Sequence, residues 1–492
     1  MLKCTVNGKE IEVAEGTMVI EAFKQAGEDI AHYCWHPGLS VAGVCRLCMI
    51  EVEGAPRLMI ACNTQVTEGM VVSNNSAKVQ EAVKWGLDFH LINHPLDCPI
   101  CDQAGECGLQ DQYMKFGQYD PEMAERKVKK RKVVDLGRKI VLDTERCILC
   151  SRCVRFTDEV TKTSELGIFN RGDRSEIGTH EDKPLDNDYA VNVVDICPVG
   201  ALTSKDFRFK QRVWYLDNDS TVCNGCSTGC NVNVYYNEKG YFRVKPEHNK
   251  DINDYWMCDK GRNIFKHVNK KNRLLKAIKK TEAGTQMMAP GAAAKDVASL
   301  IKNYSSDQVA VVFTGQYTNE EYEDAMMYID KLGTKKVYHW VNNSESFDDF
   351  DGILLRGDKN PNTAGLIKAL EAKSLNSTWE QLEAELNSGA IKLVILAGPE
   401  LQEYFPDIQE KIQLFSKAEN LVVLSSNPNP AYRDVDYLIP MKTFVEKKGS
   451  FTNFAGTVQK IQKMRLVVSQ ALSLGEAMQL MAGDELQIGA SL

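Results

Sequence analysis

Cysteines are the side chains of this sequence that could do chemistry, and they are unevenly placed. The chain has 492 residues and 16 cysteines, and every cysteine lies within the first 258 residues. A deprotonated cysteine binds zinc directly and holds iron in iron–sulfur clusters. With one histidine, the cysteines sort into four sets of four ligands, and Cys4 alone is left over.

The first set has the spacing C-x10-C-x2-C-x13-C. One C-x2-C pair with a distant cysteine on each side resembles plant-type [2Fe–2S] ferredoxins, although the first spacing differs. A zinc ribbon is the alternative, but it usually carries two C-x2-C pairs, and this set has one. We therefore expect a [2Fe–2S] cluster on Cys34, Cys45, Cys48 and Cys62.

The second set lies in "HPLDCPICDQAGEC", which has three cysteines and needs a fourth ligand. His94 is one candidate and His90, one helical turn earlier, is the other. A zinc site of the pattern H-x3-H-x3-C-x2-C is conceivable. We favour His94, because Pro95 should end the preceding helix at this residue and free the ring to turn towards the loop. The prediction is a [4Fe–4S] cluster on His94, Cys98, Cys101 and Cys107.

The third and fourth sets also have spacings that suit a cube-shaped cluster. C-x2-C-x2-C with a remote C-P is the signature of bacterial [4Fe–4S] ferredoxins. It is formed here by Cys147, Cys150, Cys153 and Cys197. The fourth set, C-x2-C-x3-C-x27-C, comprises Cys223, Cys226, Cys230 and Cys258. Zinc is the alternative for both sets.

Together the sets predict one [2Fe–2S] and three [4Fe–4S] clusters, or about 14 irons per chain. Several clusters in one chain indicate a relay of single electrons. A zinc-stabilised interaction protein is the competing interpretation.

Composition excludes several other classes of protein. The chain is 43% hydrophobic and 26% charged, with a net charge of -8, which is ordinary for a soluble globular protein of several domains. The basic run at 126–132 lacks interleaved aromatics, so we interpret it as a solvated linker or a partner-facing patch and not as a nucleic-acid site. No apolar run has the length of a transmembrane helix, and the N-terminus has no signal or transit pattern. A reducing compartment is expected, where dense cysteine favours metal binding.

The elements around the cysteines can be predicted from periodicity. Alternation predicts a β-hairpin at 2–13 that turns at Asn7-Gly8, with Cys4 on its apolar face. Helices are expected at 17–27 and 79–92, a charged loop at 120–139 and a linker at 282–294. Beyond residue 300, apolar runs of strand length alternate with helical segments, which predicts a mostly parallel sheet covered by helices. The strands are expected at 308–315, 389–399 and 420–426, and the helices at 320–332 and 400–417.

The order of the four cysteine motifs closely resembles the family of the G subunit of bacterial NADH-quinone oxidoreductase, the respiratory complex I. The resemblance is dense over residues 1–270, and "RGDRSEIGT" at 171–179 is also similar. The segment 436–459 resembles a segment of molybdopterin oxidoreductases. No cysteine follows Cys258 to hold molybdenum, so molybdopterin binding is not expected.

The resemblance implies a mixed α/β and α+β fold of several domains. It implies a [2Fe–2S] β-grasp domain at 1–78, a [4Fe–4S] module with one histidine and three cysteine ligands at 79–119, and a ferredoxin-type [4Fe–4S] module at 120–215. A molybdopterin-oxidoreductase-type [4Fe–4S] domain is expected at 216–272, followed by a shortened, degenerate α/β domain of that type at 273–492.

The resemblance also implies an electron-relay subunit of a translocating NADH dehydrogenase, without a complete active site in this chain. Its partners would be the flavin- and NADH-binding subunit and the downstream iron–sulfur and quinone-module subunits, on the cytoplasmic face of the inner membrane. Electrons would pass from the first set to the third and then to the second, and the fourth set would lie off this path. A formate dehydrogenase- or hydrogenase-type subunit with the same modules is the alternative. No nucleic acid and no direct membrane span are expected.

Overall fold

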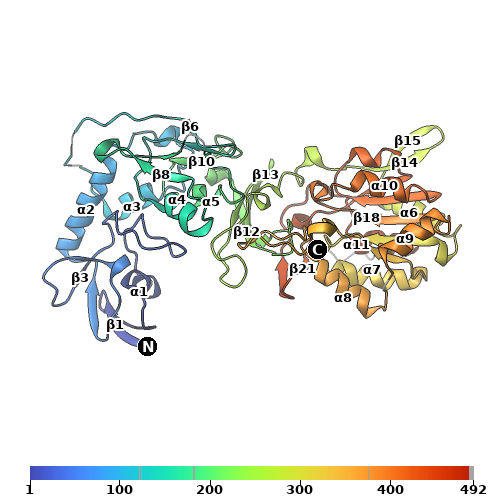
Figure 1. Ribbon diagram of the computed structural model, residues 1–492, viewed down its shortest axis with the longest axis horizontal. Coiled ribbons are helices and arrows are strands. Elements are labelled where there is room, and N and C mark those ends of the chain that lie inside the picture. Colours follow the sequence, from blue (N-terminus) through green and yellow to red (C-terminus); the bar gives the residue numbers. More distant parts are fainter. Residues whose placement is uncertain (121, 124, 181–182, 376, 487–492) are drawn as a thin grey trace. The chain divides into compact units, whose positions relative to one another are not determined.

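The computed structural model describes residues 1–120, 122–123, 125–180, 183–375 and 377–486. The chain divides into two compact units, Met1–Leu216 and Asp217–Leu492 (Figure 1). Of the helices described, none combines the length and apolar character needed to cross a membrane.

The first unit begins with a mixed sheet in the order β2-β1-β5-β3-β4. The first two strands form the predicted hairpin, in which Val6 pairs with Lys9. Asn7 and Gly8 have φ of 50° and 82°, as a type I′ turn requires. β1 also pairs with β5 in parallel. The elements are β1 (Leu2–Val6), β2 (Lys9–Val13), α1 (Val19–Gln25), β3 (Met49–Val52), β4 (Met59–Ile60) and β5 (Met70–Ser73).

Cys4 belongs to the apolar core of this sheet, as its position in the hairpin predicts. It is 4% exposed and packs in one cluster with Val6, Val13 and Phe23. Since α1 contributes Val19, Ile20 and Phe23 to the same cluster, the helix is fixed against the sheet by apolar burial.

The rest of the first unit consists of short elements that present the cysteine loops. α2 (Ala77–Leu91) begins at Ser76, whose side chain accepts a hydrogen bond from the Val79 amide, and ends before His94 as predicted. α3 (Gly108–Phe116) begins directly after Cys107. The described part of 120–139 is loop except at β6, which confirms that prediction in outline. The remaining elements are β6 (Val134–Asp135), β7 (Ile140–Leu142), α4 (Arg152–Arg155), the π-helical turn η3 (Phe156–Val160), β8 (Leu166–Phe169), β9 (Glu176–Thr179), α5 (Asn192–Asp195) and β10 (Leu202–Ser204).

The second unit starts with the antiparallel strands β11 (Asp217–Val222), β12 (Asn231–Asn237) and β13 (Gly240–Pro246). A larger sheet follows in the order β15-β14-β20-β19-β18-β16-β17. Its pairs from β20 to β17 are parallel, which confirms the predicted parallel sheet. These strands are β14 (Ala277–Thr281), β15 (Gly284–Met288), β16 (Val309–Phe313), β17 (Val337–His339), β18 (Leu393–Ala397), β19 (Asn420–Ser425) and β20 (Tyr437–Pro440). A separate pair is formed by β21 (Gly449–Thr452) and β22 (Val458–Ile461).

Helices cover both faces of the parallel sheet. Alternate residues of β16 point to opposite sides, with Val309 and Val311 in one apolar cluster and Ala310 and Val312 in the other. The first cluster receives α6 (Pro290–Ile301), α7 (Asn319–Leu332), α8 (Thr363–Ala372) and α11 (Leu474–Met481). The second receives α9 (Trp379–Asn387) and α10 (Ile408–Phe415). The helix predicted at 400–417 is correct only in its second half, where α10 spans Ile408–Phe415.

The prediction of a linker at 282–294 is wrong. β14 and β15 form a hairpin, and β14 adds to the sheet by pairing with β20. Pro290 then starts α6, where its missing N–H costs no helical hydrogen bond. Ala293 and Ala294 are fully buried, so this small-residue segment is part of the core.

We predict that Glu446→Gln strongly destabilises the second unit. The Arg273 Nη1 atom lies 2.6 Å from Glu446 Oε2, and both side chains are 0% exposed. Burial alone would raise the pKa of Glu446, but Arg273 and backbone amides hold that pKa below its usual value. The variant leaves Arg273 as a buried unpaired charge, at a cost of about 3–5 kcal/mol in unfolding free energy. Hydrogen exchange of the β18 and β19 amides measures this loss of unfolding free energy.

Lys295→Met is the control, because the Lys295–Glu485 pair is exposed and 3.8 Å apart. Exchange in this variant should match that of the unsubstituted chain. Equal protection in all three proteins would contradict the importance of the buried pair.

Candidate metal centres

The first cysteine set is buried and arranged as two close pairs. Its members are at most 7% exposed. A hydrogen bond from the Cys45 thiol lowers the pKa of Cys34 to about 5, and Cys48 lowers the pKa of Cys62 in the same way. The Tyr33 amide donates to Cys45 Sγ at 3.4 Å. Both shifts favour the thiolate, which is the form that binds metal.

The loop that carries this set makes tight turns beside its cysteines. Gly43 and Arg46 have φ of 64° and 55°, in the left-handed region. Arg46 is not glycine, so its conformation is strained. Such outliers tend to collect at functional sites, where the surroundings hold them in place.

The second set lines a single cavity of about 620 Å³. His94, Cys98, Cys101 and Cys107 all border it, whereas His90 is not among the residues that do. The Nδ1 atom of His94 is buried and has no hydrogen-bond partner in the protein. Burial, assisted by the charges of Lys127 and Arg146, lowers the pKa of His94 to about 4. The ring is therefore neutral at physiological pH, as a metal ligand must be.

The ring of His90 contacts other groups. Its Nδ1–H donates to the Gly86 carbonyl at 2.7 Å, within α2. Its ring packs edge-on against Tyr33, with 5.1 Å between ring centroids. Of the two histidines that the sequence offered, only His94 faces the three cysteines.

The basic run frames this second site through two of its lysines, and Lys132 remains 41% exposed, so the solvated linker or partner-facing patch stays a prediction. Lys127 Nζ donates to the carbonyls of Leu91 and Ile92, at 2.8 Å and 3.1 Å, where α2 ends. Lys132 Nζ lies 2.6 Å from a carboxylate oxygen of Asp97, the residue before Cys98. These contacts hold both ends of the segment that carries His94.

The third set is held by a tightly curled loop. Leu149 and Ser151 have φ of 54° and 61°, and the Leu149 amide donates to Cys147 Sγ at 3.4 Å. Burial raises the pKa of Cys153, and the neighbouring thiols of Cys150, Cys147 and Cys197 raise it further. The fold therefore brings the sulfur atom of Cys197 to three cysteines that lie far from it in the sequence.

The fourth set surrounds a small enclosed space in the second unit. Cys223, Cys226, Cys230 and Cys258 all line it. Amides donate to two of the sulfurs, Gly225 to Cys223 at 3.4 Å and Gly261 to Cys258 at 3.3 Å. A Cβ at Gly261 would lie only 3.2 Å from Cys223 Sγ, so glycine permits this close approach.

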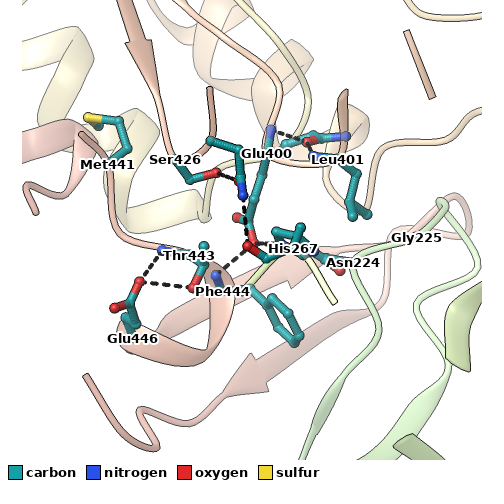
Figure 2. Close-up of polar contacts among 12 residues, drawn as sticks. Asn224, Gly225, His267, Glu400, Leu401, Ser426, Met441, Thr443, Phe444 and Glu446 are labelled. Atoms are coloured by element: carbon teal, nitrogen blue, oxygen red, sulfur yellow. Dashed lines mark hydrogen bonds and ion pairs between the residues drawn. The ribbon is translucent and has the colours of Figure 1, made fainter. Parts of the chain in front are cut away.

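A polar network at the end of β18 holds this fourth site in place (Figure 2). Glu400 Oε1 accepts hydrogen bonds from Asn224 Nδ2 at 3.1 Å, His267 Nε2 at 2.9 Å and the Phe444 amide at 3.0 Å. Asn224 lies between Cys223 and Cys226, so Glu400 fixes that turn. No motif in the sequence marks this role, because Glu400 falls at the start of the helix expected at 400–417.

The four sites share features that suit an iron–sulfur cluster. Among the described residues, no three His, Cys, Asp or Glu side chains converge to hold one metal ion. The cysteine and histidine side chains would hold an iron–sulfur cluster, which would supply one-electron redox chemistry. The bare His94 nitrogen, the cavity beside it and the amides directed at sulfur all suit such a group.

Comparison with known proteins gives a class of protein first. Four family models match: "2Fe-2S iron-sulfur cluster binding domain" (1–77), "NADH-ubiquinone oxidoreductase-G iron-sulfur binding region" (86–121), "NADH-quinone oxidoreductase subunit 3, ferredoxin-like domain" (137–203) and "Molybdopterin oxidoreductase Fe4S4 domain" (218–270). The chain is thus a mixed α/β protein with several iron–sulfur domains, which include a [2Fe–2S] domain and a [4Fe–4S] domain.

Curated relatives then give the family. The G subunit of NADH-quinone oxidoreductase from Rickettsia felis is 34% identical over 396 residues, which is 79% of this chain and 57% of that protein. Its namesake in Streptomyces coelicolor is 37% identical over 65% of this chain and 38% of that protein. Over the residues that it shares with these relatives, the chain belongs to the family of the NADH-quinone oxidoreductase G subunit.

The chain spans less than two thirds of the length of these relatives. One similar solved structure is titled "Crystal structure of NAD+-reducing [NiFe]-hydrogenase in the H2-reduced state". It is 30% identical over 43% of this chain and 91% of that chain, with a TM-score of 0.39, which is too low to support a shared fold.

We predict that His94→Ala disturbs the second cluster and that His90→Ala does not. His94 lines the cavity with Cys98, Cys101 and Cys107 and has a buried Nδ1 atom without a hydrogen-bond partner, whereas His90 does not line this cavity. The EPR spectrum of the reduced protein should lose or change one [4Fe–4S] signal in the first variant and keep all signals in the second. Identical spectra for the two variants would contradict the assignment of His94 as a cluster ligand.

We predict that Gly200→Ala also disrupts the second site. A Cβ at Gly200 would lie 2.2 Å from Cys101 Sγ, a distance that forces the cysteine away. The purified variant should lose about four irons. Gly291→Ala is the matched control, because its Cβ would make an ordinary 3.7 Å contact with Leu480. Full iron content in both variants would show that Cys101 can move without loss of the cluster.

Proposed function

We propose that this chain relays single electrons in the peripheral arm of NADH-quinone oxidoreductase, from the flavin- and NADH-binding subunit towards quinone. In the whole complex this transfer is coupled to proton translocation, and the chain itself has no complete active site. One [2Fe–2S] and three [4Fe–4S] clusters supply the redox chemistry. The observation that carries the proposal is that short bonded bridges connect the cysteine sets of the first unit.

The proposed ligands are the four sets expected from the sequence. The [2Fe–2S] cluster is held by Cys34, Cys45, Cys48 and Cys62. The [4Fe–4S] clusters are held by His94, Cys98, Cys101 and Cys107; by Cys147, Cys150, Cys153 and Cys197; and by Cys223, Cys226, Cys230 and Cys258.

Arg152 bridges the first and third sets. Its Nη2 donates to the Trp35 carbonyl at 2.6 Å, and its Nη1 donates to the Ile196 carbonyl at 3.1 Å. Trp35 follows Cys34 and Ile196 precedes Cys197. A single side chain thus spans the backbones next to one ligand of each set.

The segment after Cys197 bridges the third and second sets. The Gly108 amide, next to Cys107, donates to the Pro198 carbonyl at 2.9 Å. Two residues further on, Gly200 lies against Cys101. A covalent path with one hydrogen bond therefore runs from Cys197 to Cys107, which supports transfer from the third set to the second.

A third bridge joins the first set to the second. The His32 amide donates to Gln112 Oε1 and Gln112 Nε2 donates to the His32 carbonyl, each at 2.7 Å. Contacts alone therefore leave two routes from the first set to the second. The route through the third set is the one that the family resemblance implies, and we propose it here.

The domains can be proposed at the boundaries expected from sequence, with a β-grasp domain at 1–78, modules at 79–119 and 120–215, a cluster domain at 216–272 and a degenerate α/β domain at 273–492. The division of the chain after Leu216 supports the boundary before the fourth cluster. In the first domain, the parallel pairing of β1 with β5 beside α1 supports a β-grasp arrangement. We propose that the chain works on the cytoplasmic face of the inner membrane, with the fourth cluster off the main path.

We predict that Cys153→Ser interrupts the relay in the middle. Cys153 is 8% exposed and surrounded by the other thiols of the third set, so serine should prevent assembly of that cluster. In the assembled complex, NADH should still reduce the binuclear cluster within a catalytic turnover, while reduction of the His94-ligated cluster becomes much slower. Rapid-freeze EPR measures both signals.

Cys226→Ser is the control, because the fourth set lies in the other unit and off the proposed path. NADH:quinone activity should persist in it. Undiminished reduction of the His94-ligated cluster in Cys153→Ser would refute the proposed order of transfer. Loss of quinone reduction in Cys226→Ser would contradict the proposal that the fourth cluster lies off the path.

A further inference from the structure

One face of the helix that carries Cys153 of the third set is turned to the loop of the first set. Arg152, Arg155 and Glu159 are spaced three and four residues apart, which places them on one side of α4 and its continuation η3. Glu159 accepts a hydrogen bond from the Ser40 amide at 2.8 Å, and Arg155 Nη1 donates to the Ser40 carbonyl. Charged side chains therefore hold the loop at Ser40, in addition to the packing of Trp35 against the apolar core and the burial of Leu39.

Arg155 makes the contact that distinguishes this face. Its Nη2 donates to the carbonyl of Cys34 and also lies 3.5 Å from the carbonyl of Cys150. Cys34 belongs to the first set and Cys150 to the third. One guanidinium thus touches the main chain of a ligand of each cluster.

The charge of Arg155 lies beside a ligand of each set, because its guanidinium is within hydrogen-bond distance of the main chain of Cys34 and of Cys150. A cluster gains negative charge when it accepts an electron. A fixed positive charge between two clusters therefore favours the reduced form of each.

We propose that Arg155 is a positioning residue that fixes the ligand loops of the first and third clusters to each other and raises the reduction potentials of both. This inference rests on the proposed function, because it requires clusters at these two sites. Arginine suits the role, since its planar fork can donate to several carbonyls at once while remaining charged, and lysine offers a single point charge.

The test is an EPR-monitored redox titration of the assembled complex with Arg155→Gln, Arg155→Lys and Arg138→Gln. Arg155→Gln should lower the reduction equilibrium constants of both the binuclear and the third cluster about tenfold, or about 59 mV for one electron. Arg155→Lys should shift both in the same direction by less. Arg138 pairs with Asp186 and is exposed, so Arg138→Gln should leave both potentials unchanged.

Unchanged potentials in Arg155→Gln, with both signals present, would overturn the inference. If Arg155→Gln fails to assemble, Arg155→Lys decides, and potentials equal to those of the unsubstituted protein would overturn it. A shift in the reduction potential of only one cluster would also overturn the inference, because Arg155 would then act at a single site. Absence of the two signals from the unsubstituted protein would instead refute the proposed function.

Discussion

The mutual proximity of buried thiols is the constraint on which the rest of the structure depends. Burial raises the pKa of Cys147 to about 12 and that of Cys150 to about 11, and the neighbouring thiols add to both shifts. Bringing such groups together as thiolates is unfavourable in the protein alone. A bound metal reverses this balance, because a coordinated thiol is deprotonated outright. The binding of clusters should therefore be coupled to the folding of these loops.

The scaffold around the cysteines reduces the same electrostatic cost. Backbone amides point at the sulfurs of Cys45, Cys147, Cys223 and Cys258. Arginine and lysine side chains then fix the loops through main-chain carbonyls, as Lys127 does at the end of α2 and Arg152 does beside Trp35 and Ile196. In the second unit a carboxylate, Glu400, has this structural role. Each site therefore combines a short local motif with one distant polar residue.

The local parts of this design could be predicted from the sequence. The hairpin at Asn7-Gly8, the buried Cys4 and the end of α2 before His94 depend on turn chemistry and periodicity over a few residues, and the structure confirms them. The ligand sets are also local apart from their most distant cysteines. The choice of His94 as ligand stays a prediction, which the bare Nδ1 atom supports.

The parts that could not be predicted depend on contacts between distant segments. Residues 282–294 look like a linker, because β15 within them becomes a strand by pairing with β14, and β14 joins the large sheet by pairing with β20, more than a hundred residues later. The contacts of Lys127 and Lys132 in the basic run are not evident from the sequence, because their carbonyl and acidic partners lie up to 36 residues away. Glu400 resembles the start of a helix until the sheet places it beside Asn224.

The most direct test of the central claim is the iron, sulfide and zinc content of the chain purified without oxygen. The account predicts about 14 irons with a matching amount of acid-labile sulfide, and no stoichiometric zinc. A colourless protein with about four zinc ions and no sulfide would contradict it.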